Sequence, residues 1–550
     1  MDGYYDALRV RYERSVTTLV RDGRFREASF VLADLLGRPE AAVDLLEEHE
    51  ELALAARLAE GRQLPAAWVV RLWLPAGDLD RALRVARANG AFESALAELD
   101  RRGHAELADR MRIAWAASLA AAGCYARAVD ALWPANRLRP TTLEWIDAGM
   151  ELGGPDAVHL LLRRRELCPD RFTEDRAVLA AWLADSRPGG PHRRVLIAEA
   201  LAGLSRTDET ITLARDALRA LLPEAGPSTR PALAGLRKML RDPSLEADIP
   251  PSHLGATGPW SVILATSGTA SRIAQDAALT PAGDLLVALG HTGLLTVDND
   301  GQRRLKTDMP CTQVVVSQTG AQAIGILPLD GTGHVRLTRL DRVTGEARPW
   351  TEARIDAFAS FTDGSTWFVA HDGAVMAIDL VDGGWRHLWR VTGVGSVRAL
   401  HADDRTLRAI AHDGEGLDHW RWELPGPVLR SRTPQPTLAR SWAMGGAGTV
   451  AMHAAQFQIR TLQGKVTVLE CEPAGTPAVF RDCVVVPQIE PTGVRLLVLR
   501  STTELGTLRL QGARGAIVRA CQDHAVVWDD TGRVVAFDPH TGRVLHDCPL

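Results

Sequence analysis

Lysine is almost missing from this sequence. Only Lys238, Lys306 and Lys465 occur among 63 basic residues, which face 68 acidic residues for a formal net charge of −5. No basic run is longer than the three arginines at 163–165. A surface that neutralises a row of phosphates needs a clear excess of positive charge. We therefore do not expect nucleic acid to be the partner.

Long hydrophobic runs are also missing. No stretch approaches the roughly 18 apolar residues that a membrane-spanning helix needs, and residues 1–15 (MDGYYDALRVRYERS) contain no apolar core of the kind found in a signal peptide. We expect a protein that does not enter a membrane and stays in the cytoplasm.

The arrangement of the cysteines and the absence of common catalytic motifs argue against a metal or cofactor site. The seven cysteines are scattered, odd in number and never spaced CxxC, which favours buried thiols over disulfides or a zinc site. The sequence has no GxxxxGK[ST], GxSxG, HExxH or EF-hand motif. We therefore predict no catalytic, cofactor-binding or metal-ligating residues, and we expect no cofactor.

The first half of the chain is rich in Ala, Leu, Arg and Glu, with apolar residues at helical spacing. Six segments share the pattern GxxxxA: Gly23 with Ala28, Gly37 with Ala42, Gly77 with Ala82, Gly90 with Ala95, Gly103 with Ala108, and Gly123 with Ala128. Glycine is favoured just past a helix end, and a small alanine at the start of the next helix allows close packing. Residues 1–242 are predicted to form a solenoid-like domain of helical hairpins.

Six tryptophans in this half could line a groove for a partner peptide, but we interpret them as core residues that stack neighbouring hairpins. They are Trp68, Trp73, Trp115, Trp133, Trp145 and Trp182. Residues 243–259 are rich in Pro, Gly and Ser and are predicted to be a linker.

The second half, residues 260–550, changes to short β-rich runs separated by Gly, Asp and Asn. An aspartate is expected at the end of the third strand of each unit, at Asp298, Asp341, Asp379 and Asp538. Their spacing leaves room for three weaker units, at 418–424, 457–470 and 494–510. Units of about 40 residues with four strands are typical of a β-propeller. The sequence therefore predicts seven blades, with six or eight as the alternatives. Residues 260–267 are expected either to close the ring or to pack beneath it.

Histidines recur in the tight turns of these units. His371, Asp372 and Gly373 should lie between the second and third strands of a blade, where Asp-Gly supplies the positive φ of a hairpin turn. His291 and His412 occupy the same slot in other blades. Metal ligands must converge on one point, which turns of separate blades rarely do. We interpret these three histidines as candidates for a face that binds a partner.

The phrases AFDPHTGRVL and RLDRVTGEARPW resemble the repeat of quinoprotein-type propellers, in which a tryptophan locks adjacent blades. Trp350, with Trp385 or Trp389, would have that role here. The activity of such dehydrogenases is not implied, because many non-enzymatic scaffolds share the repeat.

The whole layout, a helical region that contains DGRFREASFVLADLLGRPEAAVDLLEEHEELALAARLAEGRQLP followed by a divergent propeller, resembles the bacterial propeller component of MoxR, von Willebrand A and β-propeller ternary systems. The resemblance implies partnership with a MoxR-type AAA+ ATPase and a von Willebrand A protein in remodelling or defence. It assigns no role to any single residue.

Two functions follow from the sequence. The first is a non-catalytic recognition or scaffold subunit, the adaptor of such a system. The alternative is a cytoplasmic enzyme whose active site lies in the central funnel of the propeller, assembled from loops of several blades, which would leave no local motif.

Overall fold

The computed structural model describes residues 2–185, 190–224, 229–241, 258–265, 270–381, 383–414, 416–435 and 439–550. Contacts divide the chain into two compact units, one of residues 1–118 with 423–428 and one of residues 119–422 with 429–550. Most of the linker predicted at 243–259 lies outside the described residues, which omit 242–257. The domain limits at 242 and 260 therefore stay a prediction.

The N-terminal half consists of short helices, as predicted. The α-helices are α1 (Asp2–Arg21), α2 (Phe25–Phe30), α3 (Pro39–Glu48), α4 (Leu52–Gly61), α5 (Ala66–Trp73), α6 (Leu79–Asn89), α7 (Phe92–Arg101), α8 (Ala105–Ala121), α9 (Tyr125–Leu132), α10 (Leu143–Leu152), α11 (Pro155–Leu167), α12 (Phe172–Leu183), α13 (Gly190–Ala202), α14 (Asp208–Leu221) and α15 (Arg230–Leu240). One π-helical turn, Val31–Leu35, follows α2 directly, and 3₁₀ turns occur at Asn136–Thr142, Pro169–Arg171 and Leu222–Glu224.

The GxxxxA pattern has the predicted meaning at all six positions. Each glycine follows a helix with φ between 60° and 86°, the left-handed region that suits glycine. Each paired alanine lies in the next helix with no exposed surface. Among the six tryptophans, Trp73 and Trp133 are buried, and the other four are half-buried. All of them except Trp68 belong to or pack against the apolar clusters of the helical region.

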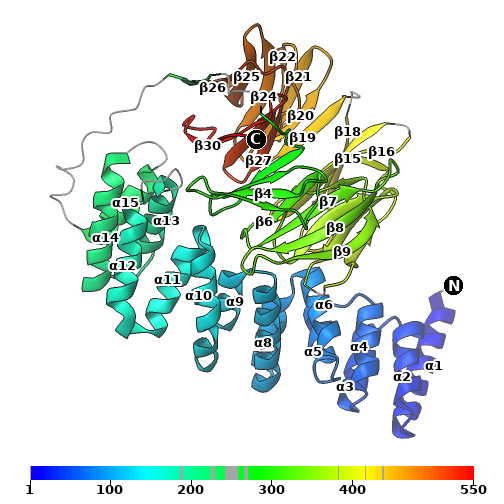
Figure 1. Ribbon diagram of the computed structural model, residues 1–550. Helices are drawn as coiled ribbons and strands as arrows, with labels where there is room; N and C mark the ends of the chain where they lie inside the picture. Colours follow the sequence, from blue (N-terminus) through cyan, green and yellow to red (C-terminus); the bar gives the residue numbers. More distant parts are fainter. Residues whose placement is uncertain are drawn as a thin grey trace. The chain divides into compact units, whose positions relative to one another are not determined.

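The described residues of the C-terminal half form seven sheets of four or five strands, so the predicted seven-bladed propeller is confirmed (Figure 1). Blades 1 to 4 are β2 (Asp276–Leu279), β3 (Leu285–Ala288), β4 (Leu294–Val297), β5 (Arg303–Lys306); β6 (Gln313–Ser317), β7 (Gln322–Pro328), β8 (His334–Asp341), β9 (Ala347–Arg354); β10 (Ala357–Phe358), β12 (Thr366–His371), β13 (Ala374–Asp379), β14 (Arg386–Val391); and β15 (Ser396–Ala402), β16 (Thr406–His412), β17 (Leu417–Glu423), β18 (Val428–Gln435). Blades 5 to 7 are β19 (Ser441–Gly445), β20 (Gly448–Met452), β21 (Gln456–Thr461), β22 (Val466–Glu470); β23 (Ala478–Val479), β24 (Val484–Glu490), β25 (Gly493–Arg500), β26 (Thr503–Gln511); and β27 (Ala516–Cys521), β28 (His524–Asp529), β29 (Arg533–Phe537), β30 (Val544–Pro549).

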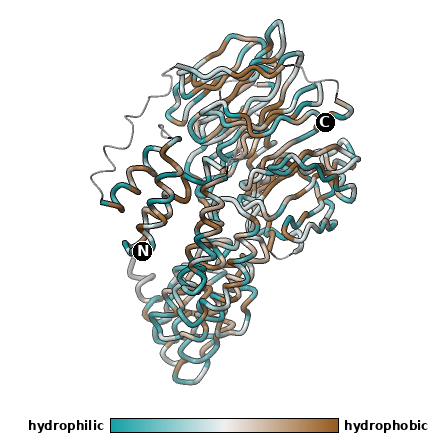
Figure 2. Tube along the Cα trace, turned by 60° about the vertical axis from the view of Figure 1, so that its left-hand side comes forward, coloured by the Kyte–Doolittle hydropathy of each residue, from teal (hydrophilic) through white to brown (hydrophobic). Residues whose placement is uncertain are grey.

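The aspartates used to set the phase of the repeat mark third strands, as predicted. Asp341 and Asp379 end β8 and β13, while Asp298 and Asp538 directly follow β4 and β29. The three weaker units begin in the third strands of blades 4, 5 and 6, and those at 457–470 and 494–510 continue into the fourth strands. Hydrophobic stretches run through the part of the chain that forms the blades (Figure 2), and the core clusters draw mainly on the first three strands of each blade.

A tryptophan does join adjacent blades. The Trp350 ring in β9 lies 5.3 Å from that of Trp385 in blade 3, and its Nε1 donates to the Gly383 carbonyl at 3.0 Å. Trp350 therefore connects blades 2 and 3.

Two extra strands extend the blades. β1 (Trp260–Leu264) pairs in parallel with β26 and becomes a fifth, outer strand of blade 6. β11 (Phe361–Thr362) pairs in parallel with β6 on the inner edge of blade 2. The segment from Trp260 therefore packs on the outer edge of a blade, neither closing the ring nor lying beneath it.

Among the described residues, the helices are all too short or too polar to cross a membrane.

Candidate functional site: the turn face and the ring centre

The turn at His371 has the geometry predicted for it. Asp372 and Gly373 have φ of 51° and 67°, the pair of positive values that a two-residue hairpin turn of type I′ requires. Asp356 holds this turn in place: its Oδ2 accepts from the Asp372 amide at 3.0 Å and lies 3.3 Å from His371 Nδ1. The His371 ring is half-buried and is thereby oriented within its own blade.

His291 and His412 occupy the corresponding turns of blades 1 and 4. His291 is exposed, and a Cβ on the following Gly293 would lie 2.2 Å from the Lys306 carbonyl, so only glycine fits there. His412 Nδ1 accepts from the Gly414 amide at 3.1 Å. The contacts of all three histidines are local, and the structure does not bring the three side chains together. Their shared feature is the face on which these turns lie.

The equivalent turn of blade 7, at Asp530, Thr531 and Gly532, is covered by the chain that leads from β1 into blade 1. A Cβ on Gly532 would lie 2.5 Å from Ala270 Cβ and 2.3 Å from the Arg272 carbonyl. The Ser271 amide also donates to the Leu550 carbonyl at 2.8 Å. This turn is therefore less accessible than the three histidine turns.

Helices of the same compact unit pack on turns that join first and second strands. Gln322 Nε2 donates to the Ala121 carbonyl at 3.0 Å, and Cys124 Sγ donates to the Asp363 carbonyl at 3.1 Å. A Cβ on Gly123 would lie only 2.1 Å from Ala321 Cβ. Because turns between first and second strands and turns between second and third strands lie at opposite ends of the strands, these helices leave the histidine face uncovered.

Arg519 and β11 lie in the middle of the ring. From the inner strand β27 of blade 7, Arg519 Nη1 donates to Asp276 Oδ2 in blade 1 and to the Val314 carbonyl in blade 2, both at 2.8 Å. Its Nη2 donates to the Ser360 carbonyl at 2.7 Å, and its guanidinium lies over the Phe361 ring of β11. Arg519 thus connects the inner strands of successive blades across the ring centre. Sequence reasoning missed this residue because its partners are more than 150 positions away.

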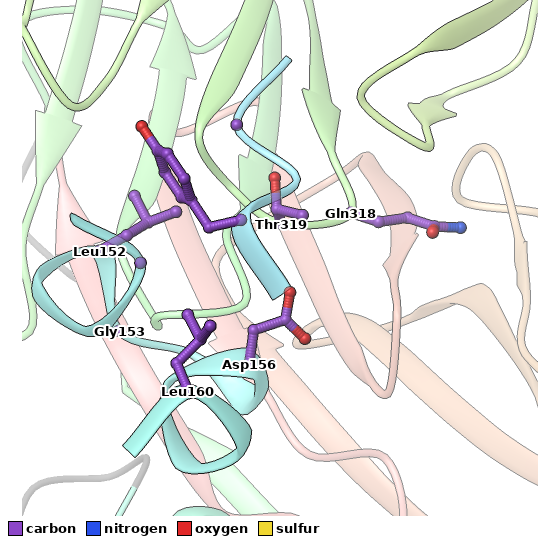
Figure 3. A pocket seen from close by; sticks show the side chains of 9 residues that line it. Leu152, Gly153, Asp156, Leu160, Gln318 and Thr319 are labelled. Atoms are coloured by element: carbon purple, nitrogen blue, oxygen red, sulfur yellow. The ribbon is translucent and has the colours of Figure 1, made fainter. Parts of the chain in front are cut away.

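A small pocket lies between α9, α10, α11 and the turn after β6 (Figure 3). Tyr125, Asp156, Leu160, Gln318 and Thr319 are among the residues that line it, and its cavity volume is about 40 Å³. Burial raises the pKa of the Asp156 carboxyl and of the Tyr125 phenol. Clefts that bind organic ligands measure about 300–1,000 Å³, so this pocket has room for only a few water molecules.

Within the described residues, Asp482, Cys483 and His540 place one potential ligand atom each within 4.8 Å of the others. Arg500 already occupies this group, because its Nη2 donates to Asp482 Oδ2 at 2.8 Å and lies 3.3 Å from His540 Nδ1. Burial raises the pKa of the Cys483 thiol to about 12, which disfavours the thiolate that a metal needs. The arrangement is that of an ion-pair network rather than of a metal centre.

No model of a known protein family matches the chain, and no curated protein matches it in sequence. Among solved structures, Hsv2 from Kluyvelomyces marxianus is 9% identical, with 51% of this chain and 99% of that chain covered and a TM-score of 0.36. BamB from Moraxella catarrhalis is 14% identical, with 52% and 92% covered and a TM-score of 0.31. Hydrazine synthase from Kuenenia stuttgartiensis is 13% identical, with 52% and 97% covered and a TM-score of 0.35.

Similarity at these TM-scores carries no argument about this chain. Its class rests on its own sheets: a seven-bladed β-propeller preceded by a helical region, a fold consistent with an interaction scaffold.

Proposed function

We propose that this protein is a non-catalytic recognition subunit, and that the propeller face carrying His291, His371 and His412 binds a protein partner. These histidines lie on tight turns of a rigid scaffold, where binding residues tend to collect. The helices that pack on turns between first and second strands occupy the other end of the blades. The histidine turns themselves range from half-buried to exposed.

The position of Arg519 and β11 in the centre of the ring is the observation that carries the proposal. The alternative enzyme needs a funnel in which groups from several blades converge around a substrate. Arg519 and β11 occupy that position here, and Arg519 is held by three hydrogen bonds. A binding function of the outer turns requires no such cavity. This arrangement therefore favours a binding function over an enzyme with its active site in the funnel.

The particular partners that we propose are a MoxR-type AAA+ ATPase and a von Willebrand A protein, in a cytoplasmic remodelling or defence system. The support for this finer assignment is the resemblance of the chain's layout, an Ala/Arg-rich helical region followed by a divergent propeller. The position of Arg519 and β11 in the ring centre supports a non-catalytic adaptor role in general. It does not support these particular partners.

The test is recovery of partners with the full-length chain from its own host, followed by mass spectrometry. We expect stoichiometric recovery of an AAA+ ATPase and a von Willebrand A protein. The triple variant His291→Ala, His371→Ala, His412→Ala should fold normally and lose most of that recovery, because the interface loses its central side chains.

A variant with His104→Ala and His387→Ala, both exposed histidines outside these turns, is the matched control and should retain its partners. Full recovery by the triple variant would refute the proposed face. Recovery of the chain alone, together with a tightly bound small molecule, would favour the enzyme.

A further inference from the structure

A buried arginine between blades 4 and 5 lacks most of its expected partners. Arg408 in β16 is 3% exposed, and its Nε and Nη1 are shielded from solvent without any hydrogen-bond acceptor. Its Nη2 lies 3.7 Å from Asp403 Oδ2, a carboxylate whose side chain is 46% exposed. A buried guanidinium with two unsatisfied donor groups is costly, since no protein acceptor replaces its lost hydration.

Two histidines surround this arginine. His401 is the cross-strand partner of Arg408 in β15, and His419 lies in β17 of the same blade with its Nε2 buried and without an acceptor. The pKa of each histidine is lowered to about 4, chiefly by burial and next by the Arg408 guanidinium. Both rings are therefore neutral at physiological pH, in a place where an anion would favour their protonated form.

Further arginines come from both sides of the interface. Arg421 in blade 4 and Arg460 in blade 5 also act on His419 and contribute to lowering its pKa. Arg421 is exposed and Arg460 is half-buried. In the described part of the chain, the only carboxylate that acts on Arg408 or on these histidines is Asp403, which also accepts from Thr406 Oγ1 and from two backbone amides. Arg408 and the two histidines are therefore influenced by more guanidinium groups than carboxylates.

The described residues bury little apolar surface between these two blades. The apolar cluster there has only three buried members, Ile410, Leu417 and Met444. On the outer strand β22 of blade 5, Val466 and Val468 stay 40% and 45% exposed. Because little apolar surface is buried between the blades, a small separation there costs less than in a well-packed interface.

We propose that the interface of blades 4 and 5 binds an oxyanion of the size and charge of phosphate, with Arg408 and His419 as its deepest donors and Arg421 and Arg460 at its entrance. The planar guanidinium matches the oxygen geometry of phosphate and can donate two parallel hydrogen bonds to it. The bound anion would satisfy donors that the protein leaves unpaired and would balance the excess positive charge. This site is independent of the histidine face proposed above.

The probe is inorganic phosphate, added to the full-length protein while thermal unfolding is followed at constant pH and ionic strength against chloride. A ligand that binds only the folded state raises the melting temperature in a saturable manner. The variant Arg408→Met removes the buried charge while keeping a long side chain. It should be at least as stable as the wild type without phosphate and should lose the phosphate response.

Arg460→Gln is the second variant, since its half-buried side chain is less essential for folding. We expect its apparent affinity for phosphate to fall by about tenfold or more, the loss expected for one charge-assisted hydrogen bond. The matched control is Arg336→Gln, an exposed arginine paired with Glu352 in blade 2, which should respond like the wild type. A phosphate response that is absent, unsaturable, or unchanged in Arg460→Gln would overturn the site, whether or not Arg408→Met folds.

Two sources could supply the oxyanion: free phosphate and a phosphorylated side chain of another protein. A phosphoserine peptide that competes with phosphate, when its unphosphorylated form does not, would assign the site to modified partners. Binding of inorganic phosphate without competition by the peptide would assign it to the free ion. If neither inorganic phosphate nor the phosphoserine peptide binds, the oxyanion site is refuted. That result would not affect the proposed histidine face, which the recovery of partners tests separately.

Discussion

Arginine supplies almost all positive charge in this protein, and two arginines of the propeller differ in how many of their donors are satisfied: Arg519 leaves only Nε without an acceptor, whereas Arg408 leaves both Nε and Nη1. Arg519 donates three hydrogen bonds and pairs with a carboxylate at 2.8 Å. Arg408 reaches only a distant carboxylate and leaves two donor groups without acceptors. A buried charge that is paired contributes to the fold, whereas an unpaired one lowers stability. We interpret the first as structural and the second as part of a binding site.

The two neutral histidines predict a loss of stability in mild acid. Because the folded state keeps the pKa of His401 and His419 near 4, only the unfolded chain takes up their protons as the pH falls from about 6.5. The free energy of unfolding should therefore decrease between about pH 6.5 and pH 4, by at most roughly 1.4 kcal/mol per pH unit for each histidine. Urea denaturation in phosphate-free buffer at several pH values measures this slope.

The variant His401→Asn, His419→Asn should show a shallower slope over the same range. His387→Asn, which changes an exposed histidine of β14, is its control and should leave the slope unaltered. An unchanged slope in the double variant would mean that both rings accept protons in the folded state. Saturating phosphate should flatten the wild-type slope, since the anion favours protonated His419.

At the scale of single elements, β1 depends on small residues of blades 6 and 7. Trp260 packs where a Cβ on Gly506 would lie 2.1 Å from its ring and a Cβ on Gly542 would lie 2.4 Å from it. The Phe537 ring lies 6.2 Å away in an edge-on arrangement. Trp260, Val262 and Leu264 are half-buried on the propeller side, while Ser261 and Ile263 face solvent. Five residues thereby shield the outer edge of β26, whose Leu508 and Leu510 are buried.

This arrangement predicts strong coupling between positions 260 and 506. Gly506→Ala should destabilise the wild type by about 1–3 kcal/mol, because the new methyl group displaces the indole ring. In the background of Trp260→Ala the same substitution should be nearly neutral, since the space is then empty. A double-mutant cycle by chemical denaturation measures this interaction energy.

Gly331→Ala is the control for the general effect of the substitution, since a Cβ there would meet nothing within 4 Å. Additive effects of the two changes at 260 and 506 would show that β1 does not occupy the slot in solution.

Repeated elements were predictable from the sequence, and single extra strands were not. The aspartates at 298, 341, 379 and 538 recur at one phase, and the GxxxxA segments share one turn geometry, so each occurrence supports the others. β11 has two residues and no counterpart in other blades. The sequence of β1 is typical of a strand. Its pairing with β26 was not predictable, because it depends on Gly506 and Gly542, which lie far along the chain.

The two candidate sites also differ in how far the sequence predicts them. Histidine turns are visible in sequence because Asp-Gly and Thr-Gly mark hairpins locally. The Arg408 cluster draws on blades 4 and 5, and its signal is a set of missing hydrogen bonds, which only coordinates reveal. That the three histidines share a binding face is still a prediction, since their contacts in the structure are local.

For the molecule as a whole, the compact unit that holds the propeller also holds the helices from residue 119 onward. Gly123, Cys124 and Ala121 contact the turns at Ala321, Asp363 and Gln322. Removal of these helices would expose the blade turns that they cover. Helical segments and propeller therefore share part of their stability within this unit.

The fragment of residues 251–550 is expected to unfold cooperatively, because each blade still packs on its neighbours around the ring. We expect it to melt at a lower temperature than the fragment of residues 119–550, which retains the helical contacts. Differential scanning calorimetry of both fragments tests this. A fragment 251–550 without a cooperative transition would refute an independently stable propeller, and equal melting temperatures would show that the helical contacts contribute nothing.

The contact of Arg519 with Asp276 joins residues 243 positions apart along the chain. Such a contact forms only after the intervening blades have been ordered, so it should be absent from the folding transition state. Loss of the guanidinium, as in Arg519→Met, should therefore accelerate unfolding in stopped-flow experiments and leave the refolding rate almost unchanged. The residue in the ring centre would then determine how long the folded ring persists rather than how fast it assembles.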